Sequence, residues 1–400
     1  MFKQYKRIRV VHIITNLSHH GSSMMLYRLM AHTDRSRFEP IVISLDRGDD
    51  FKEKISAHGI PVHTFNMSSS LSFGAHVVKL AHMLRKLSPD ILQGWQYHGN
   101  LAVSLVSKLL PKPPVLLWNV RQTVYDIEQE SNSNHWAIGF LRRLTNTPAR
   151  IIYNSWISEG QHTRLGYSEQ KSQVIANGFD LQMFAPNAHS REIIRQQLEI
   201  PEKATVIGMI AHHQPAKNHR LFIEAAHLLA RHDPDVHFIL AGNRVTADNH
   251  DIATLLQRFP ELHERLHLLG NRQDIPALLN SMDIFSLTSS SGEGFSNVVG
   301  EAMACGVPCI VTDVGDTPLL VGKTGETIKN ATASSLAFAW LEWINAGEIW
   351  RQEQGQQARQ RIQRHYRIQH IARQYQDIYE SLYHAHAAGT HSFFSQLQIA

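Results

Sequence analysis

The sequence predicts two doubly wound α/β domains in one chain of 400 residues. Three observations predict this fold. Short apolar runs alternate with segments of helical period, as in a parallel sheet that is covered by helices. The alternation stops near residues 177–190, where turn residues and a proline break the period, and then it begins again. The length also suits two domains that each bury a core.

The first half contains six candidate strands and two candidate helices. The candidate strands are rich in Val, Ile and Leu, as strands buried on both faces of a parallel sheet are. They are expected at 9–15, 39–45, 90–95, 115–120, 150–155 and 172–177, and amphipathic helices are expected at 75–87 and 100–110.

The second half repeats this rhythm with five candidate strands separated by helical segments. These strands are expected at 205–211, 236–242, 266–270, 283–288 and 307–313.

A last helix is expected at 366–386. It carries an apolar stripe that must pack on another element, formed by Ile368, Ile371, Tyr375, Ile378 and Leu382. Its position after the last strand allows it to return to the first domain. The expected boundaries are therefore 1–185 for the first domain, 186–365 for the second, 366–386 for the crossing helix and 387–400 for a flexible tail.

Composition excludes several classes of protein. The chain is 43% hydrophobic and 18% charged, which is typical of a globular protein in solution. No apolar run reaches the roughly 18 residues of a membrane-spanning helix, and no signal-peptide cleavage pattern is present, so we expect a cytosolic protein. The two cysteines lie in apolar surroundings, and His and Cys lack paired ligand spacing, so no metal site is expected.

The charged residues are unevenly divided. Residues 1–190 hold 21 basic and 13 acidic residues, a net charge of +8, whereas residues 191–400 hold 18 and 22, a net charge of −4. A basic first half suits an anionic membrane surface or an anionic substrate, and ordinary variation between solvated surfaces explains it equally well. No basic stripe interleaved with aromatic residues supports nucleic acid as a partner.

The stretch EGFSNVVGEAMACG, residues 293–306, has the features of a nucleotide-sugar site. Ligands of open α/β sheets bind beyond the carboxyl ends of strands, and this stretch follows the strand expected at 283–288. Loop glycines allow close approach, and the first N–H groups of the next helix can hold phosphate oxygens. Glu301 shares a helical face with Asn297 and can accept hydrogen bonds from two hydroxyls of a ribose. Glu293 can accept from a second sugar, although a structural role for either glutamate stays open.

The longer stretch 293–316 resembles the donor-site signature of the family-4 retaining glycosyltransferases, which have the GT-B fold. The resemblance extends from residue 10 to about residue 325, in family order, and includes the last helix. It implies two Rossmann-like domains that face each other across a cleft, the first binding the acceptor and the second the nucleotide sugar. The further stretches that carry it are 89–100, 118–123, 150–155 with 174–180, and 207–219.

The resemblance implies a role for each matching residue of the donor side. Glu301 would bind the ribose, and Glu293 would contact the transferred sugar. Lys217 matches a lysine whose charge stabilises the leaving diphosphate. His212 stands where the family usually has an arginine, and an imidazole is fully charged only where the phosphate raises its pKa. The remaining residues of the expected donor site are Gly294, Phe295, Ser296 and Asn297, of which the first three would meet the diphosphate through their backbone.

On the acceptor side, His98 matches the family's histidine that faces the donor sugar across the cleft. Asn16 and Arg121 follow two other strands and are expected to point toward the same cleft. Gly21 replaces part of the family's glycine-rich first loop, which helps to form the acceptor edge.

The expected function is retaining transfer of a sugar from a nucleotide diphosphate sugar, UDP-linked, to a glycan or lipid-linked saccharide. Capsule, exopolysaccharide or O-antigen synthesis at the inner face of the membrane is the expected setting. No metal or other cofactor is implied. Peripheral contact with an anionic membrane is expected at the helix 22–32 or around Lys79, Arg85 and Lys86. Two alternatives stay open: another GT-B enzyme such as an epimerase, and a non-catalytic partner that binds sugar nucleotides.

Overall fold

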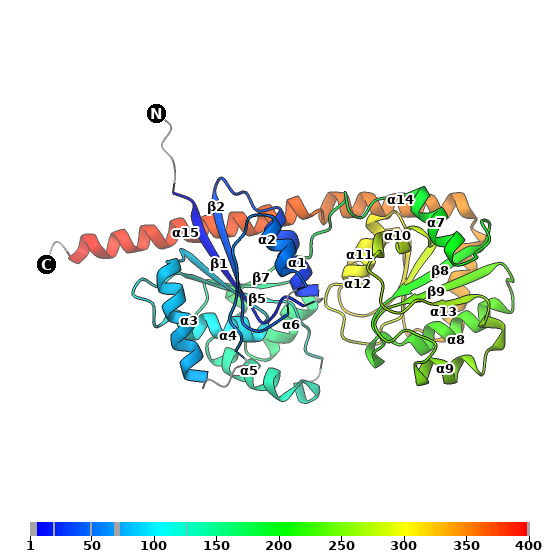
Figure 1. The fold of residues 1–400 in the computed structure, drawn as a ribbon, viewed down its shortest axis with the longest axis horizontal. Helices are drawn as coiled ribbons and strands as arrows, with labels where there is room; N and C mark the ends of the chain where they lie inside the picture. Colours follow the sequence, from blue (N-terminus) through cyan, green and yellow to red (C-terminus); the bar gives the residue numbers. More distant parts are fainter. Residues whose placement is uncertain (1–5, 19–20, 49, 68–72, 126, 398–400) are drawn as a thin grey trace. The chain divides into compact units, whose positions relative to one another are not determined.

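A computed structural model describes residues 6–18, 21–48, 50–67, 73–125 and 127–397. The chain forms two compact units (Figure 1). The first consists of Met1–Gly178 and Ile368–Ala400, and the second of Phe179–Arg367.

The first unit is built on a parallel sheet of seven strands in the order β3-β2-β1-β4-β5-β6-β7. Strand β1 is an interior strand, and its His12 lies beside Val42 of β2 and Gln93 of β4. The strands are β1 (Ile8–Ile14), β2 (Phe38–Ser44), β3 (Val62–Thr64), β4 (Ile91–Trp95), β5 (Val115–Val120), β6 (Arg150–Tyr153) and β7 (Ser172–Val174).

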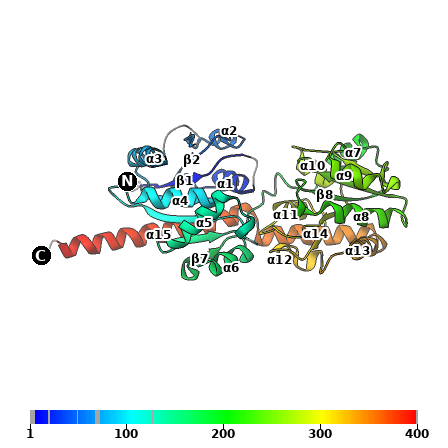
Figure 2. The ribbon, with the colours of Figure 1, turned by 90° about the horizontal axis from the view of Figure 1, so that it is seen from below.

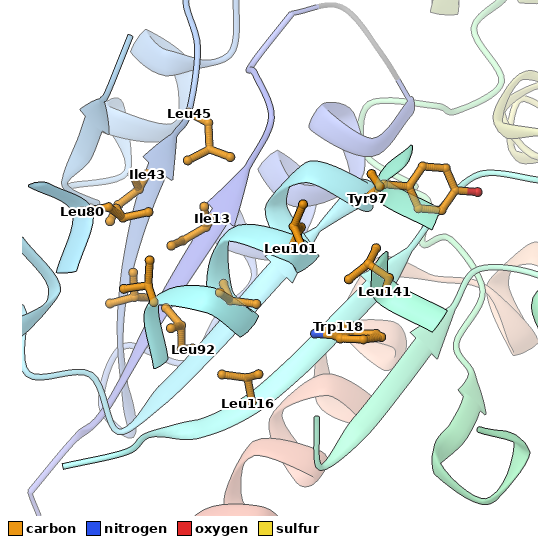
Figure 3. Packing of buried hydrophobic residues seen from close by; sticks show 14 of the residues in the cluster. Ile13, Ile43, Leu45, Leu80, Leu92, Tyr97, Leu101, Leu116, Trp118 and Leu141 are labelled. Carbon is orange, nitrogen blue, oxygen red and sulfur yellow. The ribbon is translucent and has the colours of Figure 1, made fainter. Parts of the chain in front are cut away.

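Helices cover both faces of this sheet, and each face has its own apolar core. Side chains of α3, α4 and α5 form one core with the strands, part of which is seen in Figure 3. Side chains of α1, α2 and α15 form the other. The helices are α1 (Gly21–Ala31), α2 (Lys52–Ala57), α3 (Phe73–Leu87), α4 (Gln96–Ser107), α5 (Asn132–Arg143), α6 (Trp156–Arg164) and α15 (Ile368–Leu397).

The last helix belongs to the first unit, as its apolar stripe predicts. Ile368, Ile371 and Tyr375 are buried in the core that α1 also forms, and Tyr379 donates a hydrogen bond of 2.5 Å to Gln93 Oε1 of β4. The helix continues to Leu397, beyond the expected end at residue 386. Residues 387–397 of the expected tail are therefore helical, and the flexibility of the tail stays a prediction.

The second unit is built on a parallel sheet of six strands in the order β10-β9-β8-β11-β12-β13. The strands are β8 (Thr205–Ile210), β9 (Val236–Ala241), β10 (Leu266–Leu268), β11 (Ile284–Leu287), β12 (Cys309–Thr312) and β13 (Glu326–Ile328). The helices are α7 (Ala188–Gln197), α8 (His219–Ala230), α9 (His250–Leu256), α10 (Ile275–Asn280), α11 (Asn297–Ala304), α12 (Thr317–Val321), α13 (Ala333–Asn345) and α14 (Glu348–His365).

Aromatic packing joins α8 and α13 to one face of the second sheet. The two helices lie side by side in Figures 1 and 2. The ring of Trp340 on α13 contacts Phe222 on α8 at 5.0 Å and Phe238 on β9 at 6.0 Å, and its indole N–H donates to Ser286 of β11. This buried layer holds β8 and β11 as neighbours at the centre of the sheet, which fixes the position of the loops that follow them.

The predicted fold class is confirmed, although some elements differ from those expected. Strands β3 and β13 were not predicted, because each is a three-residue edge strand without an apolar run. Helix α4 begins at Gln96 rather than near residue 100, so His98 lies in its first turn and not in a loop before it.

Candidate functional site

The predicted donor residues gather beyond the carboxyl ends of β8 and β11. The loop after β8 ends in a single 3₁₀ turn, Pro215–Lys217, and the loop after β11 leads into α11. Two bonds tie these loops together: Ser290 N–H donates to Ala216 O at 2.8 Å, and Thr288 Oγ1 donates to Lys217 O at 3.1 Å. The neighbouring strands therefore bring two distant parts of the chain into one site, as the rule for open α/β sheets predicts.

Lys217 and Glu293, which are 76 residues apart in sequence, form an ion pair at this place. The Glu293 side chain is only 7% exposed and that of Lys217 is 24% exposed, so water screens their attraction weakly. Ser289 Oγ donates a second hydrogen bond, of 2.7 Å, to the same carboxylate oxygen. The fold thus holds the two charges in contact, with the carboxylate also anchored by a hydroxyl.

Two glycines shape the loop that carries Glu293. Gly292 has a φ of 77°, a left-handed conformation that favours glycine. Gly315, in the turn after β12, has a φ of 62°, and a Cβ atom there would lie 2.0 Å from the carbonyl oxygen of Glu293. The next residue, Asp316, donates its N–H to Gly294 O at 2.9 Å. The sequence analysis missed the part of Gly315 and Ser289, although both lie in or beside the stretch that resembles the family signature.

Helix α11 carries the remaining donor candidates. Ser296 is its N-cap residue and makes no side-chain cap, so the first N–H groups of the helix are not satisfied by that hydroxyl. Phe295 is buried, with its ring 6.1 Å from that of Phe179 and 5.5 Å from that of Tyr366. The Phe179 ring also lies against Gly300, where a Cβ atom would meet it at 2.0 Å. This packing fixes the start of α11.

Glu301 lies one turn inside α11 and is 8% exposed. Burial, with a further contribution from Glu301, raises the pKa of the Cys305 thiol to about 12, so this thiol is protonated at neutral pH. Asn297, at the first position of the helix, is half-buried. These observations place both residues at α11; their roles toward a ribose stay a prediction.

Two histidines lie in the loop after β8, and a third begins α8. His212, in the position of the expected arginine, is exposed. Behind it, Gly242 allows the loop after β9 to approach, because a Cβ atom there would lie 1.9 Å from Ala211 O. His219 is buried, and burial followed by the charge of His213 lowers its pKa to about 4, so its ring is neutral at pH 7.

In the first unit, His98 borders a cavity of about 400 Å³. Its Nε2 lies 2.6 Å from Ser133 Oγ of α5, and burial lowers its pKa, so the ring is neutral at pH 7. A neutral imidazole can donate or accept a hydrogen bond according to its tautomer.

The other three acceptor candidates differ in their surroundings. Arg121 donates to Asn119 Oδ1 and Tyr375 Oη at 3.1 and 3.0 Å and also to Asn177 Oδ1, so its guanidinium belongs to an internal network that ties β5 to α15. Asn16 Oδ1 accepts from Ser18 N–H at 3.3 Å, after β1. Gly21 is exposed at the first position of α1. The acceptor roles of these three residues stay predictions.

Among the residues that the structure describes, no group of three or more His, Cys, Asp or Glu side chains could hold a metal ion.

A solved structure with the same architecture is that of HepE from Anabaena in complex with UDP. It has a TM-score of 0.80 and 22% sequence identity, and the match covers 94% of this chain and 100% of that one. The likeness shows that the fold is GT-B. Two family models also match, "Glycosyltransferase Family 4" at residues 20–183 and "Glycosyl transferases group 1" at residues 203–346. The chain belongs to the group 1, family 4 glycosyltransferases, which are a retaining family.

Two curated relatives are similar in sequence. The UDP-Gal:alpha-D-GlcNAc-diphosphoundecaprenol alpha-1,3-galactosyltransferase of Escherichia coli is 34% identical over 38% of this chain, a match that spans only 39% of that enzyme. The N,N'-diacetylbacillosaminyl-diphospho-undecaprenol alpha-1,3-N-acetylgalactosaminyltransferase of Campylobacter jejuni is 28% identical over 74% of this chain and 79% of its own length.

Proposed function

We propose that the protein transfers a sugar from a UDP-linked donor to a lipid-linked saccharide with retention of configuration, in the synthesis of a surface polysaccharide. The observation that carries the donor part of this proposal is the buried pair of Lys217 and Glu293, held between the loops that follow β8 and β11. It places a fixed cation and a carboxylate beside the start of α11, where a sugar diphosphate would need both.

Each group of the donor site has a distinct task in this proposal. Glu301 accepts hydrogen bonds from the ribose hydroxyls, and the backbone from Gly294 to Ser296 holds diphosphate oxygens. Glu293 accepts from hydroxyls of the transferred sugar. Lys217 stabilises the charge that grows on the diphosphate as the glycosidic bond breaks, and His212 donates a hydrogen bond to the same group.

The reaction needs no separate protein base. The bond between the anomeric carbon and the diphosphate oxygen breaks, and the acceptor oxygen bonds to the anomeric carbon on the same face. The proton of the acceptor hydroxyl passes to the leaving phosphate oxygen. The protein contributes position and charge stabilisation, which together account for a large part of the rate enhancement of many enzymes.

The lipid-linked acceptor and the membrane setting rest on two observations. Both relatives described above are named for diphosphoundecaprenol-linked acceptors. Residues 1–190 carry a net charge of +8, and Lys79, Arg85 and Lys86 of α3 are exposed. We therefore propose peripheral contact with an anionic membrane through α3 at the inner face. None of the described helices is long and apolar enough to cross a membrane.

The apolar residues of α1 have another role. Met25, Leu26 and Leu29 are buried in the core of the first unit, so they are not available to a lipid surface.

Calorimetric titration with UDP, GDP and ADP, without added metal, tests the donor site. We expect UDP to bind the wild type, and Glu301→Gln to weaken that binding at least tenfold, because an amide accepts fewer hydrogen bonds from a diol than a carboxylate does. Glu342→Gln, at an exposed position of α13 in the same unit, is the matched control. Equal binding by the two variants, or no nucleotide binding by the wild type, would contradict the proposal.

A further inference from the structure

The cavity beside His98 is a feature that the donor site leaves unexplained. It has a volume of about 400 Å³ and lies in the first unit between α3, α4 and the ends of β1 and β2. Its walls are mainly hydrocarbon, formed by Leu45, Met67, Val77, Leu80, Leu101 and Val106. Figure 3 shows Leu45, Leu80 and Leu101 on three different elements around Ile13 and Ile43 of the sheet.

The size and lining of this cavity suit a ligand. Its volume falls in the range of small-molecule sites, which are mostly apolar with a few polar groups.

Polar groups also line the cavity. His98 and Ser133 are hydrogen-bonded to each other at 2.6 Å. Thr15, at the end of β1, has a buried hydroxyl that makes no hydrogen bond with any described residue. Asp46 and His76 complete the polar part of the lining. The lining is therefore divided between mainly hydrocarbon walls and a few hydrogen-bonding groups.

This division indicates an amphiphilic ligand rather than a free saccharide. A sugar ring in the apolar part would lose its hydrogen bonds to water without replacement, at a cost for each hydroxyl. A hydrocarbon chain gains free energy there in proportion to the apolar area that it buries.

We propose that the cavity binds the first isoprene units of the lipid that carries the acceptor saccharide. This inference rests on the proposed function, since it takes the acceptor to be lipid-linked. The polar groups around His98 then face the head of the acceptor, and α3 and α4 enclose its chain. Contact with the chain explains how an enzyme would prefer a lipid-linked saccharide to the same saccharide in solution.

Two neighbouring valines on α3 give a matched pair of variants. Val77 lines the cavity, whereas Val78 is 63% exposed. Val77→Phe places a ring in the space that the chain would occupy, and Val78→Phe adds the same ring outside it. The probes are farnesyl diphosphate, dimethylallyl diphosphate and inorganic diphosphate, titrated into the full chain at micromolar concentration.

We expect farnesyl diphosphate to bind the wild type and Val78→Phe at least tenfold more tightly than dimethylallyl diphosphate, which has ten carbons fewer to bury. Val77→Phe should weaken farnesyl binding about tenfold, through loss of that buried area, and leave dimethylallyl binding unchanged. Equal binding of the two prenyl diphosphates by the wild type would overturn the inference. So would equal farnesyl binding by the two phenylalanine variants.

UDP binding, measured on the same samples, separates this inference from the proposed function. If the wild type does not bind UDP, the proposed donor site is contradicted. The farnesyl diphosphate titrations would still test the cavity independently. If Val77→Phe fails to fold, Ala102→Leu fills the cavity from α4 with a smaller side chain and should reduce farnesyl affinity in the same direction. Unchanged affinity in a folded Ala102→Leu protein would also overturn the inference.

Discussion

Replacing Lys217 by methionine separates the stabilising role of its ion pair with Glu293 from the catalytic role that we propose for it. The change leaves a carboxylate that is 7% exposed with Ser289 as its hydrogen-bonding neighbour and without its cation. Breaking a fully buried pair costs about 3–5 kcal/mol, and Lys217 is 24% exposed, so we expect about 2 kcal/mol here. That loss lowers Tm by about 4–8 °C for a unit of this size. Lys217→Met/Glu293→Gln should recover most of it, because a neutral amide needs no cation.

Catalysis should respond differently from stability. We expect Lys217→Met to lower kcat by roughly a hundredfold, through loss of charge stabilisation of the leaving diphosphate, and the double variant not to regain it. Calorimetric melting measures the change in stability. Release of UDP from a UDP-sugar in the presence of acceptor measures kcat. A double variant no more stable than Lys217→Met would refute the buried-charge argument. An unchanged kcat would refute the catalytic one.

Three further predictions concern other features of the two units. Gly315→Ala should destabilise the second unit by more than about 2 kcal/mol and weaken UDP binding, because its Cβ atom would displace the carbonyl of Glu293. Burial holds the pKa of His219 at about 4, below its ordinary value of 6.5, so the unfolded chain binds a proton that the folded chain excludes. Stability should therefore fall as the pH falls from about 6.5 to 4, and less steeply in His219→Asn. Lys79→Glu/Lys86→Glu should reduce co-sedimentation with anionic vesicles by more than about fivefold, because each basic residue near such a surface contributes about 1 kcal/mol.

Each of these predictions has a control. Gly347→Ala also places alanine at a positive φ, but no atom lies within 4 Å of the new Cβ, so UDP binding should stay unchanged. His250→Asn, at an exposed position, should leave the pH slope of stability as it is. Lys329→Glu, in the second unit, should leave vesicle binding intact, and vesicles of neutral lipid should not respond to either change. For each of the three predictions, an effect in the control variant but not in the test variant would contradict the argument.

The central strands could be predicted from sequence because they are buried on both faces and are therefore mainly apolar, with few polar residues. Edge strands β3 and β13 could not be predicted, since each has only three residues and lies outside any apolar run. The start of α4 was not predicted either. The N-cap residue of α4, Trp95, makes no side-chain cap, and the first helical residue, Gln96, has a φ of 63°. The usual sequence signal of a helix start is therefore absent at this position.

The residues of the candidate site could be predicted from sequence, but the contacts between them could not. Sequence resemblance selected both Lys217 and Glu293, but their contact depends on β8 and β11 being neighbours in the sheet. The hydrogen bond from Ser289 and the close approach of Gly315 likewise arise only when the loops are packed together. The cavity beside His98 could not be predicted from sequence, because it is enclosed by side chains that are far apart in the chain.

The place of α15 in the first unit has a consequence for how the protein is made. Gly178 lies so close to Ile368 that a Cβ atom there would be 2.8 Å from the Cα atom of that residue, and Ile371, Tyr375 and Tyr379 complete the core on one face of the first sheet. All seven strands of that sheet are synthesised before this helix, which follows the whole of the second unit in the chain. On the ribosome, the second unit can fold as a continuous segment, whereas the first must keep an apolar strip uncovered until α15 has been synthesised. The first unit to be synthesised is therefore the last to be completed, and it has to be protected from aggregation in the meantime.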